Sequence, residues 1–184
     1  SYANARYVEV IPEIDMPGHT NAALASIPEL NPTGVRAQPR YDIAVGYSTL
    51  MARSEATYDF VDDVIRELAA ISPSQYFHIG GDESHSTSEE DYDYFIGRVA
   101  SIVNKYGKKV VGWDPYDTST GITSKDSILQ NWHATPTTGT SAISKGMKMI
   151  LSPANAYIDQ KYYSNSPLGL QWRGLINTNK AYTW

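Results

Sequence analysis

The sequence contains no cysteine among its 184 residues. This absence excludes disulfide frameworks, thiolate zinc sites and cysteine nucleophiles, and it leaves the redox compartment undetermined. Long apolar runs are also missing: no stretch approaches the roughly 18 uncharged apolar residues of a membrane-spanning helix, so we expect no membrane span. Because Arg6 and Glu9 interrupt any apolar run near the start, we predict no secretory signal there.

Basic residues are few and scattered. The 15 basic and 20 acidic residues give a net charge of −5, and without a basic stripe nucleic acid is not an expected partner. Phenylalanine is scarce as well: three Phe stand beside 14 Tyr and four Trp, so most aromatic rings carry a polar edge. Such rings suit half-wet surfaces, including carbohydrate clefts, although composition alone favours a domain that is simply rich in surface tyrosine.

Short apolar runs alternate with amphipathic stretches along the chain, which is typical of βα units and a parallel sheet in a single domain over residues 1–184, with no second domain. Thr57 and Ser88 are candidate N-caps of the two long helices. We predict strands over 7–11, 75–79, 109–113, 127–132 and 149–152, and helices over 58–71, 88–107 and 141–145.

Chemically capable side chains follow the predicted strands. They are Glu13, Asp15, His19, Asp82, Glu83, His85, Asp114, His133, Tyr157 and Asp159. Because ligands bind at the carboxyl ends of strands in parallel α/β folds, this pattern predicts one composite site. A doubly wound sheet would show the same clustering, so the pattern by itself does not select a barrel.

The segment 78–83, His-Ile-Gly-Gly-Asp-Glu, carries the sharpest chemical signal. Its two glycines permit a tight turn and a close approach to a ligand. Two adjacent carboxyl groups, Asp82 and Glu83, follow at once, and in a partly dry site their charges would push their pKa values apart, so that one could remain protonated. The alternative is a plain Gly-Gly turn whose acids cap the next helix.

Two further features point to the same site. In the segment 12–19, Pro-Glu-Ile-Asp-Met-Pro-Gly-His, two prolines fix the backbone, and a histidine could orient a carboxylate. The alternative is a rigid loop with a structural histidine.

Trp113, Trp132 and Trp172 each lie at or beyond a strand end, where three rings could form an apolar box against a sugar face. Tryptophans of the core would give the same pattern.

Taken in order, these segments resemble the β-N-acetylhexosaminidases of glycoside hydrolase family 20, most closely the bacterial members. The resemblance rests on segments 12–19 and 78–87, together with Val111-Gly112-Trp113, Gln130-Asn131-Trp132, Ser152-Pro153-Ala154, Tyr157-Ile158-Asp159 and 167–172. It implies a TIM (β/α)₈ barrel and a retaining, substrate-assisted mechanism, an exception to the two-carboxylate rule. The expected substrate is an oligosaccharide or glycoconjugate with a terminal β-linked N-acetylglucosamine or N-acetylgalactosamine.

The resemblance also implies roles for individual residues. Glu83 matches the general acid/base, and Asp82 matches the group that orients the substrate's 2-acetamido group. Substrate-binding residues match at Trp113, Trp132, Tyr157, Asp159 and Trp172, whereas His19, Asp15 and His85 match supporting positions. No metal or other cofactor is implied.

The chain is short for such a barrel, which needs about 250 residues. The order of the motifs leads us to expect an incomplete barrel that carries about strands three to seven. The family's sugar-gripping arginine, the acidic partner of His19 and the Trp-and-Glu segment of the last strand have no counterpart here. Open sheet edges would be a liability for solubility.

Other functions remain open at this point. An incomplete barrel could bind sugar without turnover, or act as a lacto-N-biosidase. A metal-dependent hydrolase using His78, Asp82, Glu83 and His85 is a third reading, since histidine and carboxylate suit zinc or manganese. By family analogy we expect a secreted or cell-envelope protein of a bacterium.

Overall fold

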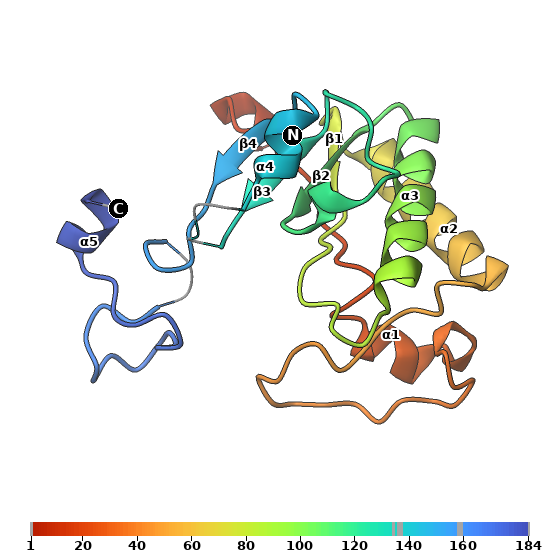
Figure 1. Ribbon diagram of the computed structural model, residues 1–184, viewed down its shortest axis with the longest axis horizontal. Helices are drawn as coiled ribbons and strands as arrows, with labels where there is room; N and C mark the ends of the chain where they lie inside the picture. The colour runs from red at the N-terminus through yellow and green to blue at the C-terminus, as the bar shows by residue number, and fades with distance from the viewer. Residues whose placement is uncertain (1, 134, 136–137, 158–159, 184) are drawn as a thin grey trace.

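The computed structural model describes residues 2–133, 135, 138–157 and 160–183. Its centre is a sheet of four parallel strands in the order β1-β2-β3-β4. The strands are β1 (Tyr76–His78), β2 (Lys109–Trp113), β3 (Ile128–Asn131) and β4 (Lys148–Leu151). Figure 1 shows them side by side with the two long helices packed at the β1 end. The sheet does not close on itself, and its strands lie side by side in chain order, as expected for an incomplete α/β barrel.

The register of the sheet is regular. Tyr76 lies opposite Lys109, Val111 opposite Ile128, and Ile128 opposite Lys148. Strand β2 has the predicted bounds, and both ends of the other three strands lie within one residue of the predicted ends. Val110, Val111, Ile128 and Leu129 of the two central strands are buried, as is typical of parallel strands with elements on both sides, whereas β4 at the edge is largely exposed.

The strand predicted over 7–11 is wrong. Only Glu13 bridges to β1, opposite His78, where the Ile14 N–H donates to the His78 carbonyl at 3.1 Å. In this register, residues 7–10 stand opposite residues that precede β1, so no strand is there to pair with them. A strand without a partner has no ladder to stabilise it, and Val8 and Val10 remain 56% exposed.

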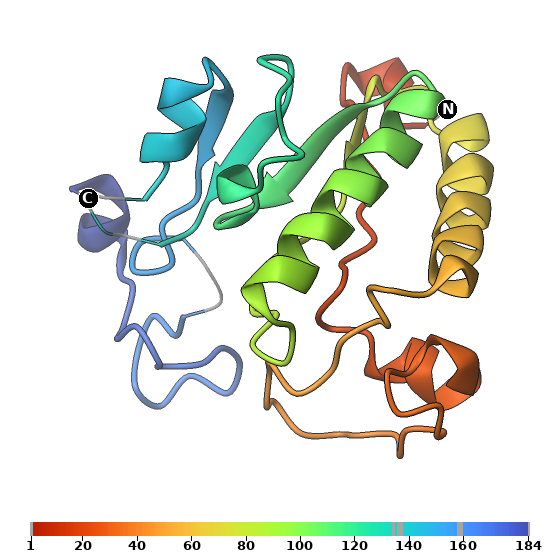
Figure 2. The ribbon, with the colours of Figure 1, turned by 45° about the vertical axis from the view of Figure 1, so that its right-hand side comes forward.

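Helices α2 (Glu55–Ile71) and α3 (Glu89–Lys105) pack side by side against the sheet (Figure 2). The Tyr58 ring packs at 5.9 Å from Phe95 between them. Ser54, rather than the predicted Thr57, is the N-cap of α2; Thr57 is instead buried, and its hydroxyl donates to the Met51 carbonyl at 2.8 Å. The predicted cap of α3 is confirmed, because the Ser88 side chain accepts from the Asp91 N–H.

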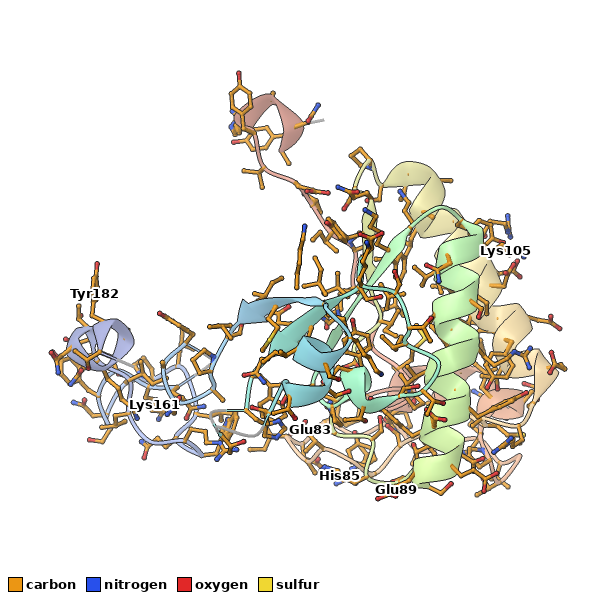
Figure 3. All side chains as sticks on the ribbon, turned by 45° about the horizontal axis from the view of Figure 1, so that its top comes forward. Glu83, His85, Glu89, Lys105, Lys161 and Tyr182 are labelled. Atoms are coloured by element: carbon orange, nitrogen blue, oxygen red, sulfur yellow. The ribbon has the colours of Figure 1, made fainter. Side chains whose placement is uncertain are left out.

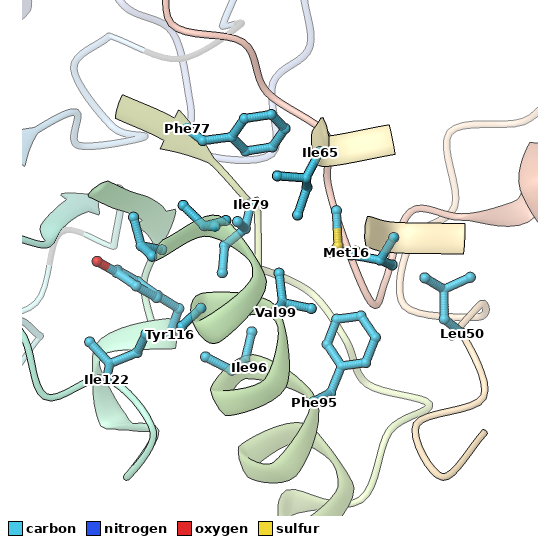
Figure 4. Close-up of a cluster of buried hydrophobic side chains, with 14 of the residues drawn as sticks. Met16, Leu50, Ile65, Phe77, Ile79, Phe95, Ile96, Val99, Tyr116 and Ile122 are labelled. Carbon is cyan, nitrogen blue, oxygen red and sulfur yellow. The ribbon is translucent and has the colours of Figure 1, made fainter. Parts of the chain in front are cut away.

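The hydrophobic core fills the space between the sheet and these two helices (Figure 4). Phe77 and Ile79 from the β1 segment meet Phe95, Ile96 and Val99 of α3, all fully buried. The core holds one face of the sheet against the helices. The opposite face, with the loops at the strand ends, is left to carry polar side chains.

Shorter helices occupy the connections. They are α1 (Asn21–Ser26), α4 (Thr140–Ser144) and α5 (Thr178–Tyr182), with 3₁₀ turns η1 (Asn4–Arg6), η2 (Pro28–Leu30) and η3 (Tyr116–Thr118). The predicted helix over 141–145 corresponds to α4, whereas α1 and α5 were not predicted. No helix in the described part of the chain is long and apolar enough to cross a bilayer.

Candidate active site

The turn after β1 sets the position of the two adjacent carboxyl groups. Gly80 and Gly81 have φ values of +69° and +103°, which glycine adopts without steric penalty. A Cβ at Gly80 would lie only 1.7 Å from Asp15 Oδ1. Since Oδ1 of Asp15 accepts from the Gly81 N–H at 3.0 Å, the glycine is what allows a side chain of the 12–19 segment to hold this turn.

His19 lies at the centre of three carboxyl groups. Its Nε2 is 3.2 Å from Glu83 Oε2, 3.5 Å from Asp82 Oδ2 and 3.9 Å from Asp15 Oδ2. The site therefore joins the 12–19 segment to the turn after β1, as the clustering of polar residues predicted. His19 and Glu83 have φ values of +55° and +47°, a conformation uncommon for residues other than glycine that concentrates at functional sites.

These contacts shift the protonation of the whole group. The hydrogen bond to Asp82 raises the pKa of His19 to about 9, against the opposing effect of burial and with help from the nearby carboxylates. At neutral pH His19 is therefore an imidazolium. Burial and the charge of Asp82 raise the pKa of Asp15 to about 8. Burial would also raise the pKa of Asp82, but the hydrogen bonds and charge of His19 outweigh it and hold that pKa below its usual range.

The predicted separation of pKa values is thus present, but in a different pair. We expected it between the sequence neighbours Asp82 and Glu83. Instead, Asp15 is the carboxyl group whose pKa is raised, while the pKa of Asp82 is lowered. Of these two groups, Asp82 lies closer to the imidazolium, with Oδ2 3.5 Å from His19 Nε2 against 3.9 Å for Asp15 Oδ2, so its ionised form is stabilised more.

One oxygen of Asp82 has no hydrogen-bond partner. Oδ2 faces His19, whereas Oδ1 is fully buried and lacks a partner among the described residues. A buried carboxylate oxygen without a donor is unfavourable by about 1–3 kcal/mol or more. Asp82 therefore holds a strong acceptor that no described donor satisfies, and a ligand N–H or O–H would reach it once the neighbouring side chains move.

The four residues considered for a metal-dependent hydrolase, His78, Asp82, Glu83 and His85, do not lie together. His85 is exposed, and His78 is buried with its Nδ1 accepting from the Gly80 N–H at 3.0 Å. Among the described residues, the one group with metal-ligand spacing is Asp15, His19 and Asp82, whose ligand atoms lie within 4.8 Å of one another. With its pKa raised to about 9, His19 is protonated at neutral pH, so in the structure this group is an ion-pair cluster.

Trp113, at the end of β2, is held in place by contacts with Glu13 and His78. Its Nε1 donates to Glu13 Oε1 at 2.9 Å, and its ring centroid lies 5.4 Å from that of His78. Glu13 Oε1 is also 3.6 Å from His78 Nδ1. Glu13 received no role from the sequence, although its place after a predicted strand was the available signal.

Trp132 is fixed by Asp114, which is only 2% exposed. The Trp132 N–H donates to Asp114 Oδ1 at 2.7 Å, and its ring N–H donates to the Asp114 carbonyl at 3.0 Å. Its ring meets Trp172 edge-on, with centroids 6.0 Å apart. The expected box of three rings is therefore a Trp132–Trp172 pair, with Trp113 packed on His78. Sequence reasoning gave Asp114 no role, because its partners lie 18 and 19 residues away.

The other expected site residues lie further out. Tyr157 is 53% exposed, and its hydroxyl donates to the Ala181 carbonyl of α5 at 3.3 Å. Trp172 is half-exposed. The His85 side chain lies against Gly46, and only its backbone N–H reaches the cluster, where it donates to the Glu83 carbonyl at 2.9 Å. Asp159 lies outside the described residues.

A cavity of about 760 Å³ opens beside Glu83. It lies between the strand ends and the start of α3, where Figure 3 labels Glu83, His85 and Glu89. Its other walls include Trp132 and His133. Its volume is within the range of ligand-binding clefts, about 300–1,000 Å³.

Comparison with known proteins matches this arrangement to one family. The family model "Glycosyl hydrolase family 20, catalytic domain" covers residues 1–184. A β-N-acetylhexosaminidase of Cellulomonas fimi is 39% identical over 183 residues, which are 98% of this chain and 36% of that protein. The solved structure of a GH20 β-N-acetylhexosaminidase from Streptomyces coelicolor A3(2) superposes with a TM-score of 0.91 at 46% identity, covering all of this chain and 38% of that one.

A Streptomyces plicatus β-hexosaminidase mutant, solved in complex with product GlcNAc, superposes with a TM-score of 0.88 at 46% identity, again over 38% of its length. The chain thus spans little more than a third of these relatives. Their fold confirms the expected TIM-barrel class, of which the four-stranded sheet is a part. On the match over its whole length, the chain belongs to glycosyl hydrolase family 20 and carries part of that family's catalytic domain.

Proposed function

We propose that this chain supplies the catalytic groups of an exo-acting β-N-acetylhexosaminidase, which removes terminal β-linked N-acetylglucosamine or N-acetylgalactosamine. The observation that carries the proposal is the unpaired Oδ1 of Asp82, on an ionised carboxylate whose other oxygen faces His19. The N–H of a 2-acetamido group is a donor of the kind this oxygen lacks. Family membership and the names of the relatives support the same substrate class.

The proposed mechanism gives each of these groups a step. Asp82 accepts the acetamido N–H and turns the acetamido oxygen toward the anomeric carbon. That oxygen bonds to the anomeric carbon as the glycosidic bond breaks, while Glu83 gives its proton to the departing oxygen. Glu83 then takes a proton from water, which attacks the anomeric carbon, opens the oxazolinium ring and restores the acetamido group. The nucleophile belongs to the substrate, so the anomeric configuration is retained.

In this mechanism His19 contacts both carboxyl groups at once. Its Nε2 lies within 3.5 Å of an oxygen of both Asp82 and Glu83, and its positive charge stabilises the ionised form of Asp82. It therefore favours the state of Asp82 that orients the acetamido group, and it holds Glu83 beside that carboxylate. A group that holds both residues at once is what a two-step reaction with alternating acid and base requires.

The first prediction concerns these two carboxyl groups, tested in the protein expressed from the whole coding sequence that contains the chain. Glu83→Gln should lower kcat for chitobiose by about 10²–10⁴-fold, because a positioned acid/base supplies that factor. Asp82→Asn should lower kcat for N-acetylglucosaminides strongly, since the acceptor for the acetamido N–H is lost. Release of N-acetylglucosamine is the measurement.

The matched control is the corresponding glucoside, which lacks the acetamido group and should be a very poor substrate for all three proteins. An Asp82→Asn protein with full activity on N-acetylglucosaminides would show the assigned role to be wrong. Saturable binding of chitobiose without turnover by the unsubstituted protein would support the sugar-binding alternative instead.

A further inference from the structure

We propose that the 760 Å³ cavity beside Glu83 binds the leaving-group part of the substrate, a neutral saccharide, and that His133 is the residue that hydrogen-bonds it. The inference rests on the proposed function, because it takes Glu83 as the group that protonates the glycosidic oxygen. Neither the cavity nor His133 belongs to the carboxylate cluster around His19.

The position of the cavity carries the first step. Glu83 lines it, whereas Asp15, His19 and Asp82 do not. Glu83 therefore stands between the cluster and the cavity. An acid that protonates a glycosidic oxygen has the cleaved sugar on one side and the leaving sugar on the other. With the acetamido group at Asp82, the leaving sugar is directed into this cavity.

His133 is held in one orientation at the cavity wall. Its Nδ1 lies 2.5 Å from Asp114 Oδ2, and Asp114 is nearly fully buried. The imidazole also stacks on Trp132, with ring centroids 4.0 Å apart. Since a buried carboxylate is an acceptor, the proton of a neutral His133 lies on Nδ1, and Nε2 is left as an acceptor for a ligand.

This constraint is what distinguishes His133 from an ordinary surface histidine. The second oxygen of Asp114 accepts the Trp132 N–H at 2.7 Å, so ring, carboxylate and tryptophan form one rigid unit. The His133 side chain keeps 34% of its surface exposed while lining the cavity. A fixed acceptor beside an aromatic ring suits a sugar, which presents hydroxyl groups at its edge and C–H groups on its face.

The charge of the cavity selects the class of saccharide. Glu89 and Asp93 line it, and no lysine or arginine does so among the described residues. Asp93 also orders two hydroxyl groups of the wall: it accepts from the Ser119 hydroxyl at 2.8 Å and from the Thr120 hydroxyl at 2.6 Å. An anionic sugar would meet like charges without a compensating base. The geometry therefore favours a neutral hexose or N-acetylhexosamine.

The test compares two substrates of the protein expressed from the whole coding sequence. Chitobiose carries a leaving sugar, whereas methyl N-acetyl-β-glucosaminide has an alkyl leaving group with no sugar ring. His133→Ala should lower kcat/KM for chitobiose about three- to tenfold, the effect of one hydrogen bond to a neutral group. It should leave the methyl glycoside within about twofold. Ser144→Ala, an exposed position of α4, is the control and should change neither substrate.

Asp114→Asn provides a second variant that keeps the shape of the wall. Its amide would present N–H groups to Nδ1, shifting the His133 proton to Nε2 and removing the acceptor. A selective loss for chitobiose is expected again, so the inference does not depend on the folding of one variant. For the unsubstituted protein, 6-sulfation of the leaving sugar should lower kcat/KM about tenfold or more, as like charges across a binding site are costly.

The outcomes separate the two proposals. No turnover of either substrate by the unsubstituted protein would overturn the proposed function and this inference with it. Turnover of both, with His133→Ala and Asp114→Asn affecting the two substrates equally or neither, would overturn only the inference. Equal efficiency on the sulfated disaccharide would contradict the neutral-saccharide assignment.

Discussion

At the scale of single residues, the site depends on one imidazolium shared by several carboxyl groups. His19 faces Asp15, Asp82 and Glu83 within 3.9 Å. Without it, three acids in a partly buried turn would repel one another, and the buried Asp82 would bind a proton. The positive charge keeps Asp82 ionised and leaves its unpaired oxygen as the acceptor on which the proposed mechanism depends.

We expect the His19 imidazole to titrate at about pH 9 in an NMR titration, well above its ordinary 6.5. Because the folded-state pKa is raised, His19 stabilises the fold fully below about pH 6.5, and this contribution is lost as the pH rises through 9. His19 contributes at most about 1.4 kcal/mol per pH unit to the slope of the unfolding free energy against pH. Asp15, with its pKa raised to about 8, changes stability in the same direction from about pH 4 upward.

Asp82→Asn tests the cause of this shift. It removes the leading contribution, the hydrogen bond between His19 and Asp82, so the titration midpoint of His19 should fall and the loss of unfolding free energy between pH 6.5 and 9 should become smaller. His85, which is exposed and outside the cluster, serves as an internal control in the same spectra, because its signal should not respond. A His19 midpoint near 6.5 in the unsubstituted protein would contradict the assignment.

At the scale of elements, α3 positions the walls of the cavity. Its first turn contributes Glu89, Tyr92 and Asp93 to the lining, and the Tyr92 hydroxyl donates to the Gly81 carbonyl at 2.7 Å. The start of this helix is therefore tied to the turn that carries Asp82 and Glu83. Its capping residue was predictable because the signal is local: a serine followed by acids whose charge suits a helix N-terminus.

Ser88→Ala should lower the free energy of unfolding by about 1 kcal/mol. The Ser88 Oγ accepts from the Asp91 N–H at 3.2 Å, and alanine leaves that donor without its partner. Chemical denaturation is the measurement, and Ser88→Asn is the matched control, since asparagine is an equally good N-cap. Equal stability of the alanine and asparagine variants would show that this cap does not contribute.

The other elements were predicted correctly where their signal is local, and wrongly where they depend on a distant part of the chain. Strand β2 and the two long helices carry their own periodic pattern and form in the predicted segments, although α2 begins three residues earlier than predicted, at Glu55. The run at 7–11 carries a strand pattern too, but whether it pairs depends on where β1 begins. A strand is defined by its neighbour, so its sequence cannot report on a partner that is absent.

At the scale of the whole molecule, the sheet presents an open edge at β4 (Figure 1). The side chains of Ile150 and Leu151 on that strand are 39% and 53% exposed. Parallel strands are normally covered on both sides, and an uncovered edge offers unpaired N–H and C=O groups together with apolar side chains. The 184-residue chain spans 36–38% of the relatives described above.

We therefore expect the 184-residue chain by itself to associate through β4 as its concentration rises. Ile150→Lys should reduce this association, because a charged side chain at a sheet edge opposes pairing with another strand. The matched control is Ile143→Lys, which replaces an isoleucine that is 67% exposed on α4 rather than on the edge. Size-exclusion chromatography with light scattering measures the mass; equal effects of the two substitutions would exclude the β4 edge as the contact.

The sequence by itself determined the family, the parallel α/β class and the segments that meet at the site, because glycines, paired acids and periodic apolar residues act over short distances. Only the tertiary structure decided which groups share protons and which rings share a wall. His19 is 63 and 64 residues from Asp82 and Glu83, and Asp114 is 19 from His133, so their contacts arise from the register of the sheet. Burial then set the pKa values, since desolvation depends on everything packed around a group and not on its neighbours in the chain.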